Sequence, residues 1–107
     1  MNEFKLRITE KHLDRAIQAA TNPTTEEKNT SIITRCILAQ AAKELFPNFY
    51  FCGWCSITTE QMYYIPVNNK ESDKVSNLTM SFDSKEYSSI RSQLPIEIEF
   101  RKGEQHV

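Results

Sequence analysis

The 107-residue sequence contains only two glycines, Gly53 and Gly103. A phosphate-binding loop needs several glycines close together, and a Gly-x-Ser-x-Gly nucleophile turn needs two of them around one serine. Neither pattern is present, so the sequence gives no sign of a nucleotide-binding loop or a serine hydrolase. We expect no catalytic residues, and we expect the protein not to be an enzyme.

Long hydrophobic runs are also absent. No uninterrupted apolar segment approaches the ~20 residues that a membrane-spanning helix needs, and the N-terminus lacks the apolar core of a signal peptide. The three cysteines are an odd number for a disulfide framework. We therefore expect a cytoplasmic protein with reduced thiols and no membrane partner.

An excess of charge of either sign is missing too. Thirteen basic and fourteen acidic residues give a formal net charge of -1, which favours neither a polybasic binder nor a mimic of nucleic acid. A chain of this length forms about one domain. We expect residues 1–107 to be a single domain that ends in a frayed tail at 102–107.

Alternating residues predict a strand at each end of the chain. Phe4, Leu6 and Ile8 share one face of the first strand, and residues 96–100 alternate in the same way. The outward residues are basic in the first strand and acidic in the last: Lys5 and Arg7, then Glu97 and Glu99. Because opposite charges favour cross-strand pairing, we expect the terminal strands to be neighbours.

Capping residues and apolar spacing predict three helices. Thr9 is the expected N-cap of a helix that ends before Asn22–Pro23, with His12 in a cap-region or surface role. A central core helix is expected over Thr30–Leu45, with Gln40 on its polar stripe and Leu45 in the core. Asp83 is the expected N-cap of the third helix, with Glu86 as its capping-box partner.

The remaining segments are read as a hairpin and two loops. Phe49–Thr58 and Met62–Val67 are rich in aromatic and β-branched residues, which predicts two paired strands. Residues 21–30 and Asn68–Ser76 are polar and are expected to be loops. The order β-α-α-β-β-α-β predicts an α+β two-layer sandwich, with a four-stranded, mostly antiparallel sheet and helices on one face.

Cys52-Gly53-Trp54-Cys55 is the most prominent chemical motif. In redox proteins a Cys-x-x-Cys pair opens a helix, which lowers the pKa of the thiol. Here the surrounding pattern predicts a strand, in which residues three apart point to opposite faces. A zinc site would need four ligands from three cysteines, His12 and His106, and only one Cys-x-x-Cys half is present. We expect no metal and no cofactor, and a thiol-dependent redox or zinc-binding protein is the third reading.

Basic residues are concentrated in the first half of the chain. They are interleaved with acidic residues, which weakens any positive field. A small nucleic-acid-binding module is therefore the alternative reading, not the preferred one. The cations concerned are Lys5, Arg7, Lys11, Arg15, Lys28, Arg35 and Lys43.

Aromatic residues are in surplus on the predicted hairpin. If Phe49 and Phe51 point into the core, Tyr50 and Trp54 point outward, joined by either Tyr63 or Tyr64 from the partner strand. Tyrosine and tryptophan dominate interface hot spots, although a covering loop or a cross-strand aromatic ladder would explain the same pattern. We predict that this face binds a protein partner or a second copy of the chain.

Two segments carry a family resemblance, Ile8-Thr9-Glu10-Lys11-His12-Leu13 and Arg35-Cys36-Ile37-Leu38-Ala39-Gln40-Ala41-Ala42. They resemble small uncharacterised α+β proteins of bacteriophages and mobile elements, although Ile37 stands where that pattern has proline. The resemblance implies an accessory factor that acts stoichiometrically on a host protein, for example one of a host immune system, in the host cytoplasm. The preferred reading is thus a non-enzymatic protein-binding domain that inhibits or modulates a host protein.

Overall fold

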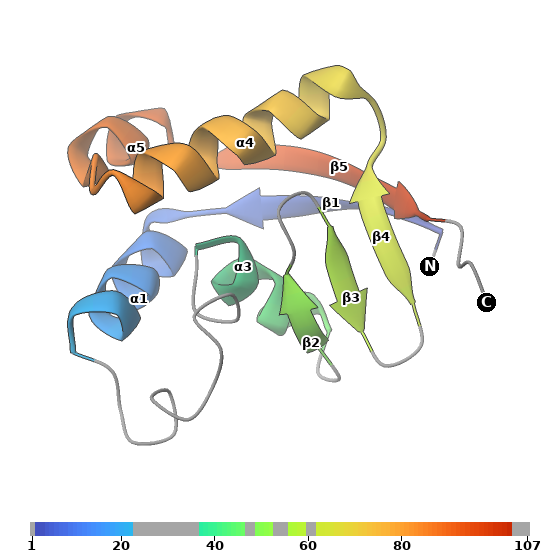
Figure 1. The fold of residues 1–107 in the computed structure, drawn as a ribbon, viewed down its shortest axis with the longest axis horizontal. Coiled ribbons are helices and arrows are strands. Elements are labelled where there is room, and N and C mark those ends of the chain that lie inside the picture. The colour runs from blue at the N-terminus through green and yellow to red at the C-terminus, as the bar shows by residue number, and fades with distance from the viewer. Residues whose placement is uncertain (1, 23–36, 47–48, 53–55, 60–61, 104–107) are drawn as a thin grey trace.

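The computed structural model describes residues 2–22, 37–46, 49–52, 56–59 and 62–103, with the side chains of 49–52 left out. A curled antiparallel sheet of five strands, in the order β1-β5-β4-β3-β2, is combined with helices (Figure 1). The predicted α+β class is confirmed. The strands are β1 (Glu3–Ile8), β2 (Phe49–Cys52), β3 (Ile57–Thr59), β4 (Tyr63–Pro66) and β5 (Ile96–Lys102).

The two terminal strands pair antiparallel, as the charge pattern predicts. Lys5 lies opposite Glu99 and Arg7 lies opposite Glu97. Lys5 Nζ is 3.8 Å from Glu99 Oε1. Exposed pairs of this kind contribute only ~0.2 to 1 kcal/mol each, so the buried residues between them supply most of the stability of this strand pair.

The hairpin is confirmed, but the strand expected over residues 49–58 is two strands. β2 and β3 lie on either side of residues 53–55, and β3 pairs with β4. Thr59 shapes the turn between β3 and β4, because its hydroxyl accepts the Met62 N–H at 3.0 Å and its own N–H donates to Met62 O at 2.8 Å. The structure therefore has one more strand than the sequence pattern predicts.

Helices α1 (Glu10–Thr21) and α3 (Ile37–Leu45) pack against each other. Thr9 is the N-cap of α1, as expected. The expectations for α3 were wrong at two positions: Gln40 is buried, and Leu45 is 42% exposed. The reason is that β1, β2, α1 and α4 all contact α3, which leaves little room for a polar stripe, and the chain turns Phe46 inward in place of Leu45.

The region from Asn68 to Gln93 differs most from the prediction. Asn68–Ser76, expected to be a loop, contains the start of α4 (Asn69–Asp83), and Asp83 is its last residue, not the N-cap of the next helix. The side chain of Asn68 caps α4 by accepting the Glu71 N–H at 3.0 Å. Lys85 then takes a positive φ of 60°, and α5 (Tyr87–Gln93) begins after Glu86.

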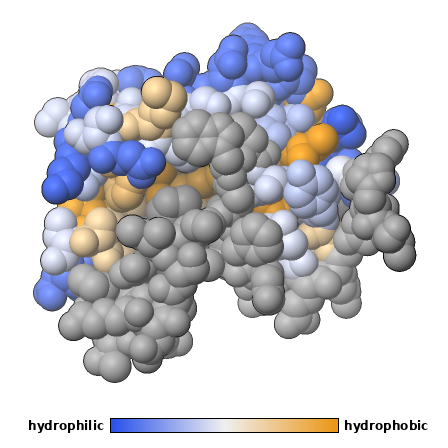
Figure 2. All heavy atoms as spheres, in the orientation of Figure 1, coloured by the Kyte–Doolittle hydropathy of each residue, from blue (hydrophilic) through white to orange (hydrophobic). Residues whose placement is uncertain are grey.

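The core lies between the sheet and the helices. Leu6, Ile8, Ile98 and Phe100 point from β1 and β5 toward it, and all four are buried. In Figure 2, hydrophobic residues form a band across the middle of the visible face, below a hydrophilic upper edge. The opposite side of β1 and β5 carries the exposed charged residues and forms the outer face of the sheet.

Helix α4 runs beside the part of β5 that β4 does not reach (Figure 1). Glu71 Oε2 accepts the Glu99 N–H at 3.4 Å, and Lys74 Nζ donates to Glu97 O at 3.0 Å. These bonds satisfy backbone groups of β5 that have no neighbouring strand at this point and would otherwise lack a partner. In the part of the chain that the structure describes, no helix is both long and apolar enough to cross a membrane.

Candidate binding surfaces

The predicted partner-binding residues do not share one surface. Tyr64 is only 3% exposed and packs on Phe4 and Phe46, with ring centroids 5.0 and 5.2 Å away. Its inclusion among the outward residues was therefore wrong, because alternation along β4 turns Tyr64 inward and Tyr63 outward. Trp54 and the side chain of Tyr50 lie outside the described residues, so their predicted role stays a prediction.

Tyr63 lines a hollow of about 620 Å³ on the outer face of the sheet. We call it the outer hollow. Its volume falls within the ~300 to 1,000 Å³ typical of binding pockets. The residues that line it come from β4 and β5, from the start of α4 and the two residues before it, and from the residue before β3: Ser56, Tyr63, Ile65, Pro66, Val67, Asn68, Asn69, Ser72 and Arg101.

The ring of Tyr63 is held against the buried Gly103. A Cβ atom placed on Gly103 would approach the ring of Tyr63 far more closely than real Cβ atoms do, and the Gly103 N–H donates to Tyr63 O at 2.7 Å. A half-buried tyrosine fixed in this way loses little conformational entropy when a partner covers it. It therefore suits a binding anchor.

Arg101 adds a charge to the same hollow. It lies opposite Ile65 on β4 and opposite Glu3 on β1, and its side chain is exposed. Among the described residues its guanidinium contacts only the carbonyl of Lys102, at 3.4 Å, and no carboxylate lies within ion-pair distance. The hollow thus combines an aromatic ring, an aliphatic side chain and a cation that forms no ion pair with the described residues.

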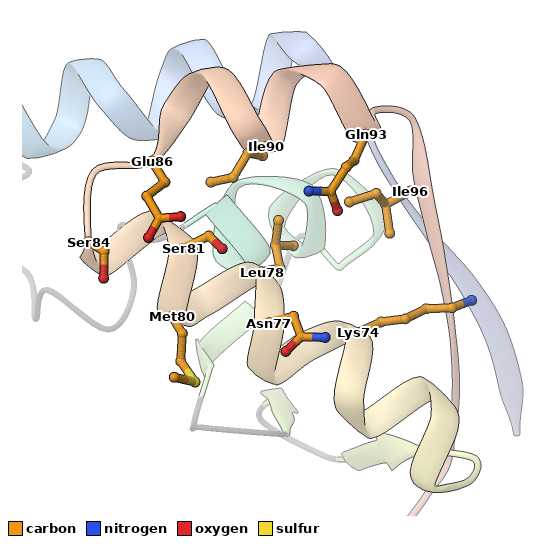
Figure 3. Close-up of a pocket in the computed structure, with 10 residues that line it drawn as sticks. All are labelled: Lys74, Asn77, Leu78, Met80, Ser81, Ser84, Glu86, Ile90, Gln93 and Ile96. Atoms are coloured by element: carbon orange, nitrogen blue, oxygen red, sulfur yellow. The ribbon is translucent and has the colours of Figure 1, made fainter.

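A second hollow, of about 590 Å³, runs between α4 and α5. We call it the helix groove. In Figure 3 the side chains of Leu78, Ile90 and Ile96 lie between the two helices, and Met80 extends from the outer rim of α4. Met80 is 57% exposed, which is unusual for a large apolar residue.

The ends of the helix groove differ in charge. At one end Lys74 is compensated, because its Nζ lies 3.0 Å from Glu71 Oε2. At the other end Glu86 stands beside Ser81 and Ser84 (Figure 3). Glu86 is exposed and has no ion-pair partner among the described residues. This end therefore carries an uncompensated negative charge.

The buried carboxylate of Glu71 matters for both hollows, because it holds α4, which contributes residues to both, against β5. Burial raises the pKa of Glu71, but hydrogen bonds from Lys74 and from the Glu99 N–H outweigh burial, and the net shift of the pKa is downward from 4.5. The charged form is thus the one that the fold stabilises.

His12 lies in a smaller hollow between β1, α1 and α3. Of the two roles that the sequence allowed, cap region or surface, the surface role does not apply, since the side chain of His12 is only 5% exposed. The expected role near the helix cap is confirmed, because His12 Nδ1 accepts the Thr9 N–H at 3.0 Å. An accepting Nδ1 carries no proton, so Nε2 carries the proton of the neutral ring. Nε2 faces Glu44 Oε1 at 3.0 Å, although no hydrogen bond of good geometry forms.

Glu44 collects positive charge from α1. Lys11 Nζ and Arg15 Nη1 each lie 3.0 Å from Glu44 Oε1. The pKa of Glu44 is lowered, chiefly by the hydrogen bond from Lys11 and further by contact with His12. Burial raises this pKa but does not outweigh these contacts. Thr9 also lines this hollow, and its Oγ1 lies 3.3 Å from His12 Nδ1. The contacts show His12 at the cap of α1 and Glu44 paired with Lys11 and Arg15.

The same contacts bear on the nucleic-acid alternative. Lys11 and Arg15 share the single carboxylate of Glu44, and Lys5 is paired with Glu99. Positive charges that already have partners attract phosphates weakly. The described cations therefore favour this alternative less than their number in the sequence suggests.

Metal and thiol chemistry receive little support from the described residues. No three side chains of His, Cys, Asp or Glu within them lie close enough to hold a metal ion. Cys52 is the last residue of strand β2, as the strand prediction requires, and not the first residue of a helix. Cys36, Cys55 and His106 lie outside the described residues.

Sequence reasoning missed the helix groove because it read residues 68–76 as a loop. Two signals were present in the sequence. Asn68 and Glu71 have the spacing of an N-cap and its N3 partner. Four buried residues of α4 also recur with helical spacing: Glu71, Val75, Leu78 and Phe82. Because the first of them is a carboxylate, the spacing does not read as an apolar stripe.

Comparison of the chain with protein families, with curated proteins and with solved structures gave no match.

Proposed function

We propose that the protein is a non-catalytic binding domain that docks a partner protein in the outer hollow. The observation that carries this proposal is the position of Tyr63, which is half-buried, fixed against Gly103 and placed beside Arg101, a cation without an ion pair among the described residues. Tyrosine and arginine are the residue types that contribute most to interface hot spots. The protein acts by occupancy, one copy per target, and not by turnover.

The chemistry of the hollow defines the partner. Tyr63 and Ile65 offer apolar surface, and Arg101 calls for a carboxylate. The surrounding rim of Asn68, Asn69 and Ser72 offers amide and hydroxyl groups. A partner surface with an aliphatic or aromatic side chain next to an aspartate or glutamate satisfies all of these groups.

The experiment is affinity capture followed by titration. Wild-type protein and the Tyr63→Ala, Arg101→Ala and Arg7→Ala variants are immobilised and exposed to lysate, and the affinity of each retained protein is then measured by calorimetry. Arg7→Ala is the matched control, because Arg7 is also an exposed arginine but lies outside the hollow.

The expected result is a partner bound at a one-to-one ratio. Loss of the tyrosine anchor is expected to weaken binding about thirtyfold and Arg101→Ala about tenfold, while Arg7→Ala has an effect below about twofold. Partners that bind Tyr63→Ala as well as wild type would overturn the proposal. If sedimentation instead shows a dimer that requires Tyr63, the partner is a second copy of the chain.

A further inference from the structure

We propose that the helix groove is a second binding site, which receives a short amphipathic helix with a basic residue at one end. This site is independent of the outer hollow, because the two share no lining residue.

The floor of the groove is apolar and its rim is polar. Leu78, Ile90 and Ile96 lie inside, and Asn77, Ser81, Ser84 and Gln93 surround them (Figure 3). An apolar centre within a polar rim is the usual anatomy of a protein-binding site. Met80 lies on the outer rim and points to the side of α4 away from α5 (Figure 3).

The walls decide which backbone conformation fits. A peptide that added as a strand would have to pair with the edge of β5, the only described strand that borders the groove. That edge is blocked, since Lys74 already bonds Glu97 O and Glu71 already bonds the Glu99 N–H. An occupant must bind through side chains alone, which is the way an amphipathic helix packs between two others.

The charge of the groove sets the direction of the occupant. Lys74 is neutralised by Glu71, whereas Glu86 is uncompensated and has the hydroxyls of Ser81 and Ser84 nearby. Lys85 is the nearest cation in sequence and does not line the groove. A lysine or arginine of the occupant therefore lies at the Glu86 end. The stretch of α4 from Lys74 to Ser84 is about 15 Å long, which about three turns of a helix would cover.

The test uses a displayed library of random peptides of about 12 residues, selected against the full chain. Selected peptides are synthesised with a fluorophore, and their affinity is measured by anisotropy. Three variants probe the groove: Met80→Asp, Glu86→Lys and, as the matched control, Asp83→Lys. Asp83 is an exposed acid near Glu86 that does not line the groove. Tyr63→Ala tests whether the outer hollow has been selected by mistake.

The expected peptides carry apolar residues at i, i+3 or i+4 spacing and a basic residue at one end, and they gain helicity on binding. Glu86→Lys is expected to weaken them about fivefold to tenfold, and replacing the basic residue of the peptide by glutamate restores the affinity for this variant. Asp83→Lys and Tyr63→Ala leave the affinity within about twofold.

Four results would overturn this proposal. The first is a library that yields no binders, and the second is a set of selected peptides that lack the helical spacing. The third is an affinity that Met80→Asp and Glu86→Lys leave unchanged, and the fourth is binding that Tyr63→Ala abolishes. The last result would support the outer hollow alone, so the two sites fail separately.

Discussion

The outer hollow borders the first residues of α4, the helix groove runs along the rest of this helix, and the two are built in different ways. In the outer hollow the strands β4 and β5 fix the directions of Tyr63, Ile65 and Arg101, because residues alternate between faces. The helix groove exists only while α5 stays at a given distance from α4. Buried Ile90 sets that distance from the inside, and Arg91 reaches from α5 to Asp14 of α1 at 2.7 Å on the outside. The outer hollow therefore depends on the register of β4 and β5, and the helix groove depends on the packing of α5 beside α4.

The largest effect is expected from Glu71→Ala, which acts on both surfaces. It removes a nine-tenths buried carboxylate and leaves Lys74 and the Glu99 N–H without their partner. We expect a loss of about 2 to 3 kcal/mol in the free energy of unfolding, measured by urea titration. A loss below about 0.5 kcal/mol would show that α4 is held by its apolar stripe alone.

The pH dependence of stability sharpens the same point. Because the folded state lowers the pKa of Glu71 below 4.5, its contribution is fully present above that pH and is lost as the pH falls through the folded pKa. Glu71→Gln is therefore expected to reduce the acid sensitivity of the unfolding midpoint below pH 4.5. Glu44 retains its own acid sensitivity in this variant, since its pKa is also lowered. Unchanged pH profiles would contradict the assignment.

Gly103→Ala should separate the two surfaces. The added methyl group would displace the ring of Tyr63 from its present position. We expect a loss of about 1 to 2 kcal/mol in stability and weaker binding in the outer hollow. Peptide binding in the helix groove should remain at the wild-type level. A variant that binds both ligands normally would mean that the position of Tyr63 is not important for docking.

Arg91→Ala is expected to have the smallest effect on stability, because its ion pairs with Asp14 and Glu10 are exposed. Its effect on the helix groove should be visible, since these pairs join α5 to α1. We expect faster hydrogen exchange in α5 and weaker peptide binding, with the outer hollow unaffected. Equal hydrogen exchange in variant and wild type would show that Ile90 holds α5 without help.

The fold was predictable where the pattern is local and regular. Strict alternation identified β1 and β5, and their opposite charges identified them as neighbours, because a cross-strand pair is readable from two short segments. The secondary-structure prediction failed where the same local pattern fits two different structures. Asp83 and Asn68 both have the spacing of an N-cap, and only Asn68 precedes a stripe long enough to build a helix on the core.

Of the candidate sites, the sequence indicated the outward direction of one tyrosine on the hairpin but could not decide between Tyr63 and Tyr64. The choice depends on the register of β4 against β5, which places Tyr64 over Phe4 and Phe46. No sequence pattern indicated Met80 or Glu86, because the groove they border forms only when α4 and α5 lie together.

The amino-acid sequence by itself determined the class of this fold, the paired terminal strands and the cap of α1, because each follows from spacing within a few residues. The tertiary structure alone decided which polar residues are buried and where the hollows lie. Besides its local partner Lys74, Glu71 accepts the Glu99 N–H of β5, and besides its local partner Thr9, His12 faces Glu44 of α3. The partners on β5 and α3 come from distant parts of the chain, so their contacts are decided by the packing of whole elements and not by any local pattern.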